Sequence, residues 1–325
     1  MKVAVTGAAG FVGVNLVEQL LDAGHEVVAI DRVRSNALAA TGVTWIDGDI
    51  LDLDSMIRAL DGVEVVYHLV AVITLAQQDD LAWRVNTEGV RTVAEAALTV
   101  GARKVVHCSS LHAFDQYHLG SALNESSARA TGADLPVYDR SKWQGEVELL
   151  KVVDRGLDAV ICNPTGIYGP IDYGLSRMNA MLRDAARGRM PVGVAAKFDM
   201  VDVRDVAAGL IAAAEKGERG ENYLLTGHMV GLTELARTAA RSVGRRGPRF
   251  SIPLRALELV LPIADPIGSR LGSDILSKGA IDTLLTSPVV DGSKAARVLG
   301  YLPRPTEETM RDLMTFLVGS GQLRR

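Results

Sequence analysis

The sequence contains few cysteines and few aromatic residues, and neither sign of charge dominates it. Cys108 and Cys162 are the only cysteines among 325 residues, so a disulfide framework is excluded and a buried core must supply the stability. Aromatic residues make up 5%, too few for an obvious base-stacking platform. Lys and Arg number 35 against 39 Asp and Glu, a net charge of −4. We therefore expect no nucleic-acid partner.

Long apolar runs are also missing. Residues 254–267 form the most apolar stretch, but they include Arg255, Glu258 and Asp265 and are too few to cross a bilayer. The chain opens directly on a strand-like pattern rather than on a signal peptide. We predict a cytoplasmic protein without an integral membrane segment. An amphipathic contact of residues 254–267 with a membrane surface stays open.

The first half alternates short β-branched runs with helical patterns. Strands are predicted at 2–6, 26–30, 43–46, 64–69, 103–108 and 157–162, and helices at 11–23, 52–60, 86–100 and 138–155. This alternation requires parallel pairing with crossover connections, and the nearly continuous apolar strands indicate burial on both faces. The sequence therefore predicts an α/β fold, a Rossmann-type doubly wound parallel sheet.

The second half is less regular and predicts a smaller lobe. We expect residues 1–163 to form the dinucleotide-binding domain, with residues 197–226 returning to it. Residues 164–196 and 227–325 are expected to form a C-terminal substrate-binding lobe that lies over the edge of the sheet.

The sharpest motif is a glycine-rich turn between the first strand and the first helix. Gly7, Gly10 and Gly13 surround Phe11 and Val12, which begin the helix. Glycine lets the backbone turn tightly and approach a ligand closely, and a helix N-terminus favours a pyrophosphate. The pattern predicts a dinucleotide site.

Acidic residues follow the next two strands. Asp31 directly follows the second strand, where a carboxylate accepts hydrogen bonds from the adenosine ribose and repels a 2′-phosphate. This favours NAD, although Arg32 could hold a phosphate and keeps NADP as the alternative. Asp49 and Ile50 follow the third strand, where Asp49 could bind the adenine amino group.

A Tyr and a Lys lie one helical turn apart, after a Ser that ends a strand. Tyr138 and Lys142 share one helix face, and a neighbouring Lys is expected to lower the pKa of the phenol. Ser110 lies at the carboxyl edge of the sheet, where ligands bind. These three residues predict a catalytic group in which Tyr138 is the general acid and base and Ser110 orients the substrate oxygen.

Together these motifs resemble the extended short-chain dehydrogenase/reductase superfamily, the NAD-dependent epimerase/dehydratase family, over nearly the whole chain. Further matching segments are Tyr67-His68-Leu69, Ser109-Ser110, residues 163–170 and residues 201–207. The sequence looks most similar to the dihydroflavonol-reductase-like and aldehyde-reductase-like branch. The resemblance implies that Lys142 binds the nicotinamide ribose. It also implies cofactor contacts from Leu69, Val70, Ala71, Asn86, Ser109, Tyr138, Pro164 and Ile167.

Three positions depart from the family pattern. Asp31 resembles the NAD-using epimerases and hydroxysteroid dehydrogenases more than the NADP-using reductases. Leu111-His112 follows Ser110 where the related sugar dehydratases carry an Asp-Glu pair, which disfavours dehydration. We interpret His112 as a structural histidine, with substrate contact as the alternative.

The resemblance implies an NAD(P)-dependent oxidoreductase that interconverts an alcohol with a ketone or aldehyde on a hydrophobic small molecule. A sugar-nucleotide epimerase and a non-catalytic NAD(P) sensor are the alternatives. We predict no metal, because His, Asp and Glu do not cluster at metal-ligand spacing. We also expect a homodimer formed by the helices that contain Asn86 and Tyr138, with Ala94 and Ala97 opposite Trp143 across a twofold axis.

Overall fold

A seven-stranded parallel sheet forms the centre of the protein in the computed structural model, which describes residues 1–39, 41–117, 122–253 and 287–324. The strand order is β10-β6-β5-β4-β1-β2-β3, which reverses beside β1 as in a dinucleotide-binding sheet. The predicted Rossmann-type fold is confirmed. The strands are β1 (Lys2–Thr6), β2 (Glu26–Asp31), β3 (Thr44–Asp47), β4 (Val65–His68), β5 (Lys104–Cys108), β6 (Ala159–Pro164) and β10 (Asn222–Leu225).

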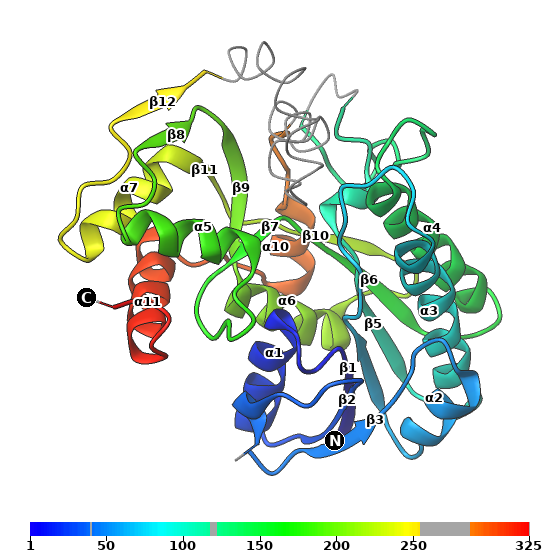
Figure 1. The fold of residues 1–325 in the computed structure, drawn as a ribbon. Coiled ribbons are helices and arrows are strands. Elements are labelled where there is room, and N and C mark those ends of the chain that lie inside the picture. Colours follow the sequence, from blue (N-terminus) through cyan, green and yellow to red (C-terminus); the bar gives the residue numbers. More distant parts are fainter. Residues whose placement is uncertain (40, 118–121, 254–286, 325) are drawn as a thin grey trace.

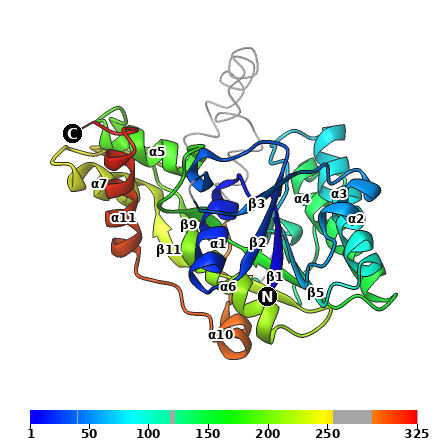
Figure 2. The same cartoon turned by 90° about the horizontal axis from the view of Figure 1, so that it is seen from below.

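Helices cover both faces of this sheet, so each strand is buried on both sides (Figures 1 and 2). On β1, Val3 and Val5 pack toward one face and Ala4 toward the other. One face is covered by α1 (Phe11–Asp22), α6 (Val203–Lys216) and α10 (Ser293–Leu299). The other is covered by α2 (Leu53–Ala59), α3 (Asp80–Thr99) and α4 (Val137–Val153).

A second group of elements forms a smaller lobe beside the sheet (Figure 1). Its strands form a three-stranded sheet, β11-β9-β7, and a two-stranded sheet, β12-β8. Leu182, Leu235 and Leu313 are among the residues of its own buried core. The elements are β7 (Gly166–Tyr168), α5 (Arg177–Ala186), β8 (Val192–Val194), β9 (Lys197–Asp202), β11 (His228–Gly231), α7 (Leu232–Ser242), β12 (Phe250–Ile252) and α11 (Thr306–Gly319).

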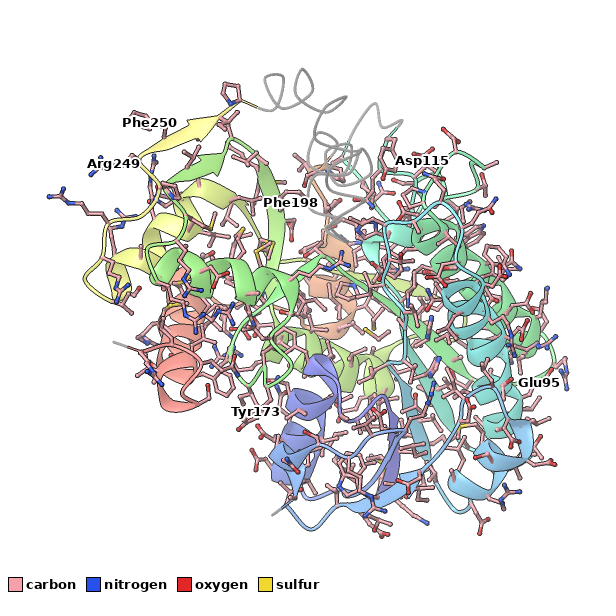
Figure 3. All side chains as sticks on the ribbon, in the orientation of Figure 1. Glu95, Asp115, Tyr173, Phe198, Arg249 and Phe250 are labelled. Carbon is pink, nitrogen blue, oxygen red and sulfur yellow. The ribbon has the colours of Figure 1, made fainter. Side chains whose placement is uncertain are left out.

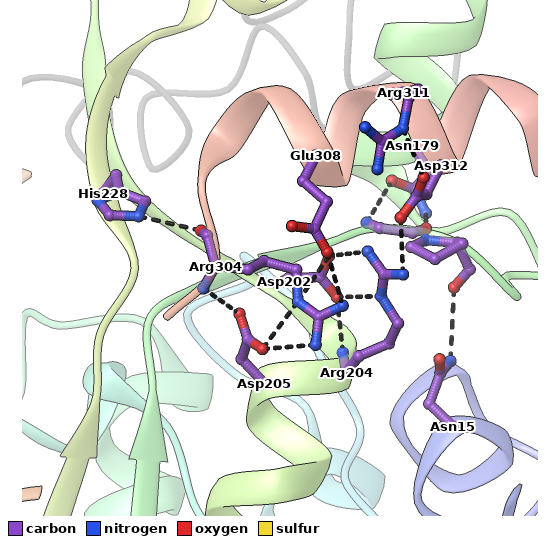
Figure 4. A network of polar contacts seen from close by, with 12 residues as sticks. Asn15, Asn179, Asp202, Arg204, Asp205, His228, Arg304, Glu308, Arg311 and Asp312 are labelled. Atoms are coloured by element: carbon purple, nitrogen blue, oxygen red, sulfur yellow. Dashed lines mark hydrogen bonds and ion pairs between the residues drawn. The ribbon is translucent and has the colours of Figure 1, made fainter. Parts of the chain in front are cut away.

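An ion-pair network joins α11 to the start of α6 (Figure 4). Arg204 contacts Asp202 at 2.7 Å and Asp312, on α11, at 2.8 Å. Arg304 contacts Asp205 at 2.8 Å, and the side chain of Asp202 is 0% exposed. The network therefore ties the C-terminal helix to the dinucleotide-binding sheet through a buried carboxylate.

Replacement of Arg204 with Ala is expected to lower the free energy of unfolding by about 2 kcal/mol, because it leaves the buried Asp202 carboxylate short of a partner. Urea unfolding followed by circular dichroism measures the change. Arg311→Ala is the matched control, because Arg311 is 70% exposed and such pairs contribute about 0–1 kcal/mol. Equal losses in the two variants would contradict this account.

Two structural expectations are wrong. The helix expected over residues 86–100 begins at Asp80, because the Asp79 side chain accepts a hydrogen bond from the backbone N–H of Ala82 and caps it. Ala94 and Ala97 are 1% and 0% exposed within a single chain, so they cannot contact Trp143 of another copy. The homodimer itself stays a prediction.

Two further expectations concern membranes and metals. Within the described part of the chain, no helix has both the length and the apolar character needed to cross a bilayer. The open alternative of a membrane contact at residues 254–267 lies outside the described residues. A search of the described residues finds no group of His, Cys, Asp and Glu that could hold a metal ion.

Candidate active site

The glycine-rich turn adopts a conformation that side chains would obstruct. Gly7 has φ +76°, and its N–H donates to the carbonyl of Ile30 at 2.9 Å. A Cβ on Gly13 would lie 2.2 Å from the carbonyl oxygen of Gly7. Gly10 caps α1 without a side-chain hydrogen bond, so bare backbone surrounds the positive end of the helix. This cradle fits the pyrophosphate of a dinucleotide.

A cavity of about 250 Å³ lies between this turn and the loop after β7. Gly10 and Phe11 line it on one side, and Ile171 and Tyr173 on the other. Asn15 of α1 donates to the carbonyl of Ile171 at 3.3 Å and so links the two sides. The predicted residues Gly10 and Phe11 therefore lie at an open cavity, whereas Val12 packs against the core on one face of the sheet.

Asp31 lies at the glycine-rich turn itself. Its Oδ2 accepts a hydrogen bond from the backbone N–H of Ala9 at 3.0 Å. Its Oδ1 accepts a hydrogen bond from the backbone N–H of Arg32 at 2.7 Å. Arg32 is exposed, as is Asp49, whereas Ile50 is buried beneath Gly89 of α3. Asp31 thus presents a half-buried negative charge where the second strand meets the cradle.

The backbone after β4 is held by Asn86. Its Oδ1 accepts from the N–H of Val72 at 2.9 Å, and its Nδ2 donates to the carbonyl of Val72 at 2.9 Å and to Ser141 Oγ at 3.0 Å. Asn86 therefore fixes the segment that contains Leu69, Val70 and Ala71, the predicted cofactor contacts. Among the described residues, the Asn86 side chain forms hydrogen bonds with the backbone of Val72 and with the Ser141 hydroxyl.

Ser110, Tyr138 and Lys142 come together at the carboxyl ends of β5 and β6. The Ser110 side chain lies beside the Tyr138 side chain, and Lys142 Nζ donates to the carbonyl of Cys108 at 3.1 Å. All three are buried, with exposures of 8%, 8% and 2%. The structure therefore brings the predicted residues Ser110, Tyr138 and Lys142 together at this edge of the sheet.

The expected lowering of the pKa of Tyr138 by Lys142 is not observed. Burial raises the pKa of the phenol, and the hydrogen bond with Ser110 opposes this rise without cancelling it. Burial also lowers the pKa of Lys142, whose ammonium group is directed to the Cys108 carbonyl. The reason is desolvation, which penalises the phenolate and the ammonium alike.

The buried hydrogen-bond network that reaches the backbone carbonyl of Ser110 was not identified from the sequence. Glu146 is 0% exposed and accepts hydrogen bonds from Asn163 at 2.6 Å, Asn222 at 3.0 Å and Arg129 at 3.2 Å. Asn163 also donates to the carbonyl of Ser110 at 2.9 Å. The missed signal is the continued four-residue spacing from Tyr138 through Lys142 to Glu146 on one face of α4.

A second missed pair lies beside Tyr138. His112 Nδ1 lies 3.0 Å from Asp139 Oδ1, and the rings of His112 and Tyr138 are 5.3 Å apart between centroids. His112 follows Ser110 in a short 3₁₀ turn at Leu111–Ala113, so both members of the pair adjoin the predicted catalytic group. Nothing in the sequence spacing indicates a contact between residues 112 and 139.

The remaining predicted residues lie at or after the ends of β5 and β6 and on β7. Pro164 ends β6 and is buried, and Ile167 lies half-buried on β7 against β9. Ser109 is buried, and its Oγ has no hydrogen-bond partner among the described residues. No described hydrogen bond links these three residues to one another.

Comparisons with known proteins show which family the chain is similar to. The NAD dependent epimerase/dehydratase family profile matches residues 3–226. Sterol demethylase protein B of Methylococcus capsulatus is 33% identical, over 99% of this chain and 100% of the relative. A 3 beta-hydroxysteroid dehydrogenase/Delta 5-->4-isomerase of Mycobacterium tuberculosis is 27% identical, over 98% and 90%. The crystal structure of gox2253 superimposes with a TM-score of 0.85 at 28% identity and covers 99% of each chain.

Proposed function

Because the chain belongs to the NAD-dependent epimerase/dehydratase family, we propose that it is an oxidoreductase that interconverts a secondary alcohol and a ketone on a hydrophobic, sterol-like small molecule. The observation that carries the proposal is the placement of Ser110 beside Tyr138, with Lys142 one turn along α4. The relatives named for sterol and 3β-hydroxysteroid chemistry support the substrate class.

Two exposed apolar side chains lie in the loops that follow β4 and β7. Ile73, after β4, is 62% exposed, and Tyr173, after β7, is 57% exposed. Figure 3 shows Tyr173 beside α1, at the end of the glycine-rich turn. Ligand cavities are lined mainly by apolar and aromatic side chains, and Tyr173 contributes one to the cavity beside the glycine-rich turn.

The chain's own residues supply binding and proton transfer. Ser110 Oγ would hold the substrate oxygen, and the Tyr138 hydroxyl would exchange a proton with it. Gly7, Gly10 and Gly13 would cradle the cofactor's pyrophosphate. NAD, when bound, supplies the hydride chemistry.

A substrate screen tests this proposal. The purified protein is incubated with NAD or NADP and with 3β-hydroxysteroids, simple secondary alcohols, dihydroflavonols and UDP-sugars, and reduced nicotinamide is followed by absorbance. We expect reduced cofactor to form with hydroxysteroids or other apolar alcohols. Conversion of a UDP-sugar without net cofactor reduction would instead favour the epimerase alternative suggested by the family's name.

We further expect NAD to bind more tightly than NADP. The Asp31 carboxylate would face a 2′-phosphate of the same charge, which costs on the order of 1 kcal/mol at a partly exposed site. Asp31→Asn should narrow this preference, because an amide can still accept the hydrogen bond from Ala9 but carries no charge. Fluorescence titration with NADH and NADPH measures both affinities. About tenfold tighter NADPH binding by the unmodified protein would show that Arg32 governs the site instead.

A further inference from the structure

His112 and Asp139 form a pair that the Ser-Tyr-Lys scheme does not use. His112 Nδ1 lies 3.0 Å from Asp139 Oδ1, and the Asp139 side chain is 3% exposed. The Tyr117 hydroxyl contacts the other carboxylate oxygen, Oδ2, at 3.5 Å. A buried carboxylate that contacts one imidazole nitrogen fixes the ring and favours its protonated form.

The pair is connected to the predicted catalytic group on two sides. The backbone N–H of His112 donates to Ser110 Oγ at 3.2 Å, and Asp139 directly follows Tyr138 on α4. The His112 and Tyr138 rings lie 5.3 Å apart between centroids, inclined at 60°. The imidazole is therefore a near neighbour of the phenol whose hydroxyl contacts Ser110.

Exposure distinguishes His112 from the other titratable groups at this place. Tyr138 is 8% exposed and Lys142 is 2% exposed, with its ammonium group directed to the Cys108 carbonyl. The His112 side chain is 27% exposed. Among the described titratable side chains around Tyr138, His112 thus both adjoins Ser110 and Tyr138 and is accessible to solvent.

We propose that His112, held by Asp139, relays to solvent the proton that Tyr138 exchanges with the substrate, an inference that rests on the proposed oxidoreductase function. In alcohol oxidation the substrate O–H bond breaks, the C=O bond forms and the hydride leaves to NAD. Tyr138 takes the hydroxyl proton, and His112 passes that proton onward. In ketone reduction the proton travels the opposite way. His112 acts through Tyr138 and is thus a positioning residue.

The charges that face His112 determine the expected pH dependence. Burial lowers the pKa of His112, but the charge of Asp139 and its hydrogen bond outweigh burial, so the pKa is raised. Tyr138 on α4 and Tyr117 on the preceding loop are the other titratable groups beside the pair among the described residues. A relay in the oxidation direction needs neutral His112, so kcat should rise with pH as His112 loses its proton.

The test is the pH profile of kcat for oxidation of the alcohol found in the screen. Asp139→Asn should shift the low-pH limb of the profile to lower pH by about one pH unit, because the substitution removes the charge that raises the pKa of His112. His112→Gln should abolish that limb and lower kcat by about tenfold, with KM little changed. Added imidazole should restore part of the activity of His112→Ala. His228→Gln, at a histidine that contacts the Arg304 carbonyl away from this site, is the matched control.

Each outcome is decisive. The relay would be overturned if the low-pH limb of the kcat profile stayed in place in both Asp139→Asn and His112→Gln. It would also be overturned if His112→Ala lost activity that imidazole did not restore. Either result would leave the proposed oxidoreductase function unaffected. An unmodified protein that reduces no nicotinamide with any alcohol would overturn the proposed function and the relay with it. A His112 pKa that Asp139→Asn leaves unchanged, measured by NMR titration of the imidazole, would overturn the pairing without any activity measurement.

Discussion

Replacement of Tyr138 with Phe is expected to lower kcat by about 10²–10⁴-fold, because general acid–base groups contribute on this scale. The phenol loses its hydroxyl but keeps its ring, so the packing against His112 should survive. NAD binding should be essentially unchanged, since the glycine-rich turn and Asp31 are untouched. Initial rates and an NADH fluorescence titration on the same preparation measure the two effects separately.

Ser110→Ala provides the matched comparison for this prediction. It removes the hydroxyl that lies beside Tyr138 and also the acceptor for the N–H of His112. We expect a smaller loss of kcat than in Tyr138→Phe, because the proton-transfer group remains. Wild-type turnover by Tyr138→Phe would refute the mechanism, whereas loss of NAD binding together with activity would show that the variant disturbs the fold.

Replacement of Gly13 with Ala is expected to weaken NAD binding by at least about tenfold, or about 1.4 kcal/mol. The new Cβ would lie 2.2 Å from the carbonyl oxygen of Gly7 and 2.8 Å from the backbone of Ala8. The turn must open to relieve this overlap, and the opening displaces the backbone that cradles the pyrophosphate. Isothermal calorimetry with NAD measures the loss, and thermal melting checks the fold.

Two glycine variants test whether the loss belongs to the cradle. Gly10→Ala places its Cβ 3.2 Å from the Gly7 carbonyl oxygen, so a small shift suffices and a smaller loss of affinity is expected. Gly319→Ala, at the end of α11, meets no atom within 4 Å and should bind NAD like the unmodified protein. Unchanged affinity in Gly13→Ala at an unchanged melting temperature would contradict the assignment of the cradle.

The sequence was sufficient where short-range patterns carry the information. The strand, glycine-rich turn and helix at residues 2–22 are specified by backbone freedom and hydrophobic periodicity, and the structure has them within a residue of prediction. The four-residue spacing of Tyr138 and Lys142 determines their common helix face in the same way. Cys108 and Cys162 end the predicted strands at 103–108 and 157–162, and the structure pairs them in register between β5 and β6.

Helix boundaries were less predictable. The helix that contains Asn86 begins six residues before it, at Asp80, because the Asp79 carboxylate caps the N-terminus. Charged and polar residues at 77–80 indicate a loop when only hydrophobic periodicity is counted. The side-chain hydrogen bond that decides the boundary is a local contact, but one of several that the same residues could make.

By itself, the amino-acid sequence determined the doubly wound class and the glycine-rich turn after the first strand, and it predicted Ser110, Tyr138 and Lys142 as the catalytic group. All of these depend on spacing along the chain. Only the tertiary structure brought Glu146 to Asn163 and Asn222, placed His112 against Asp139, and directed Asp31 to the turn at Ala9. It also set the raised pKa of Tyr138, because desolvation depends on what packs around a group. Contacts between distant residues and the burial of charge follow from how elements assemble, which no local pattern encodes.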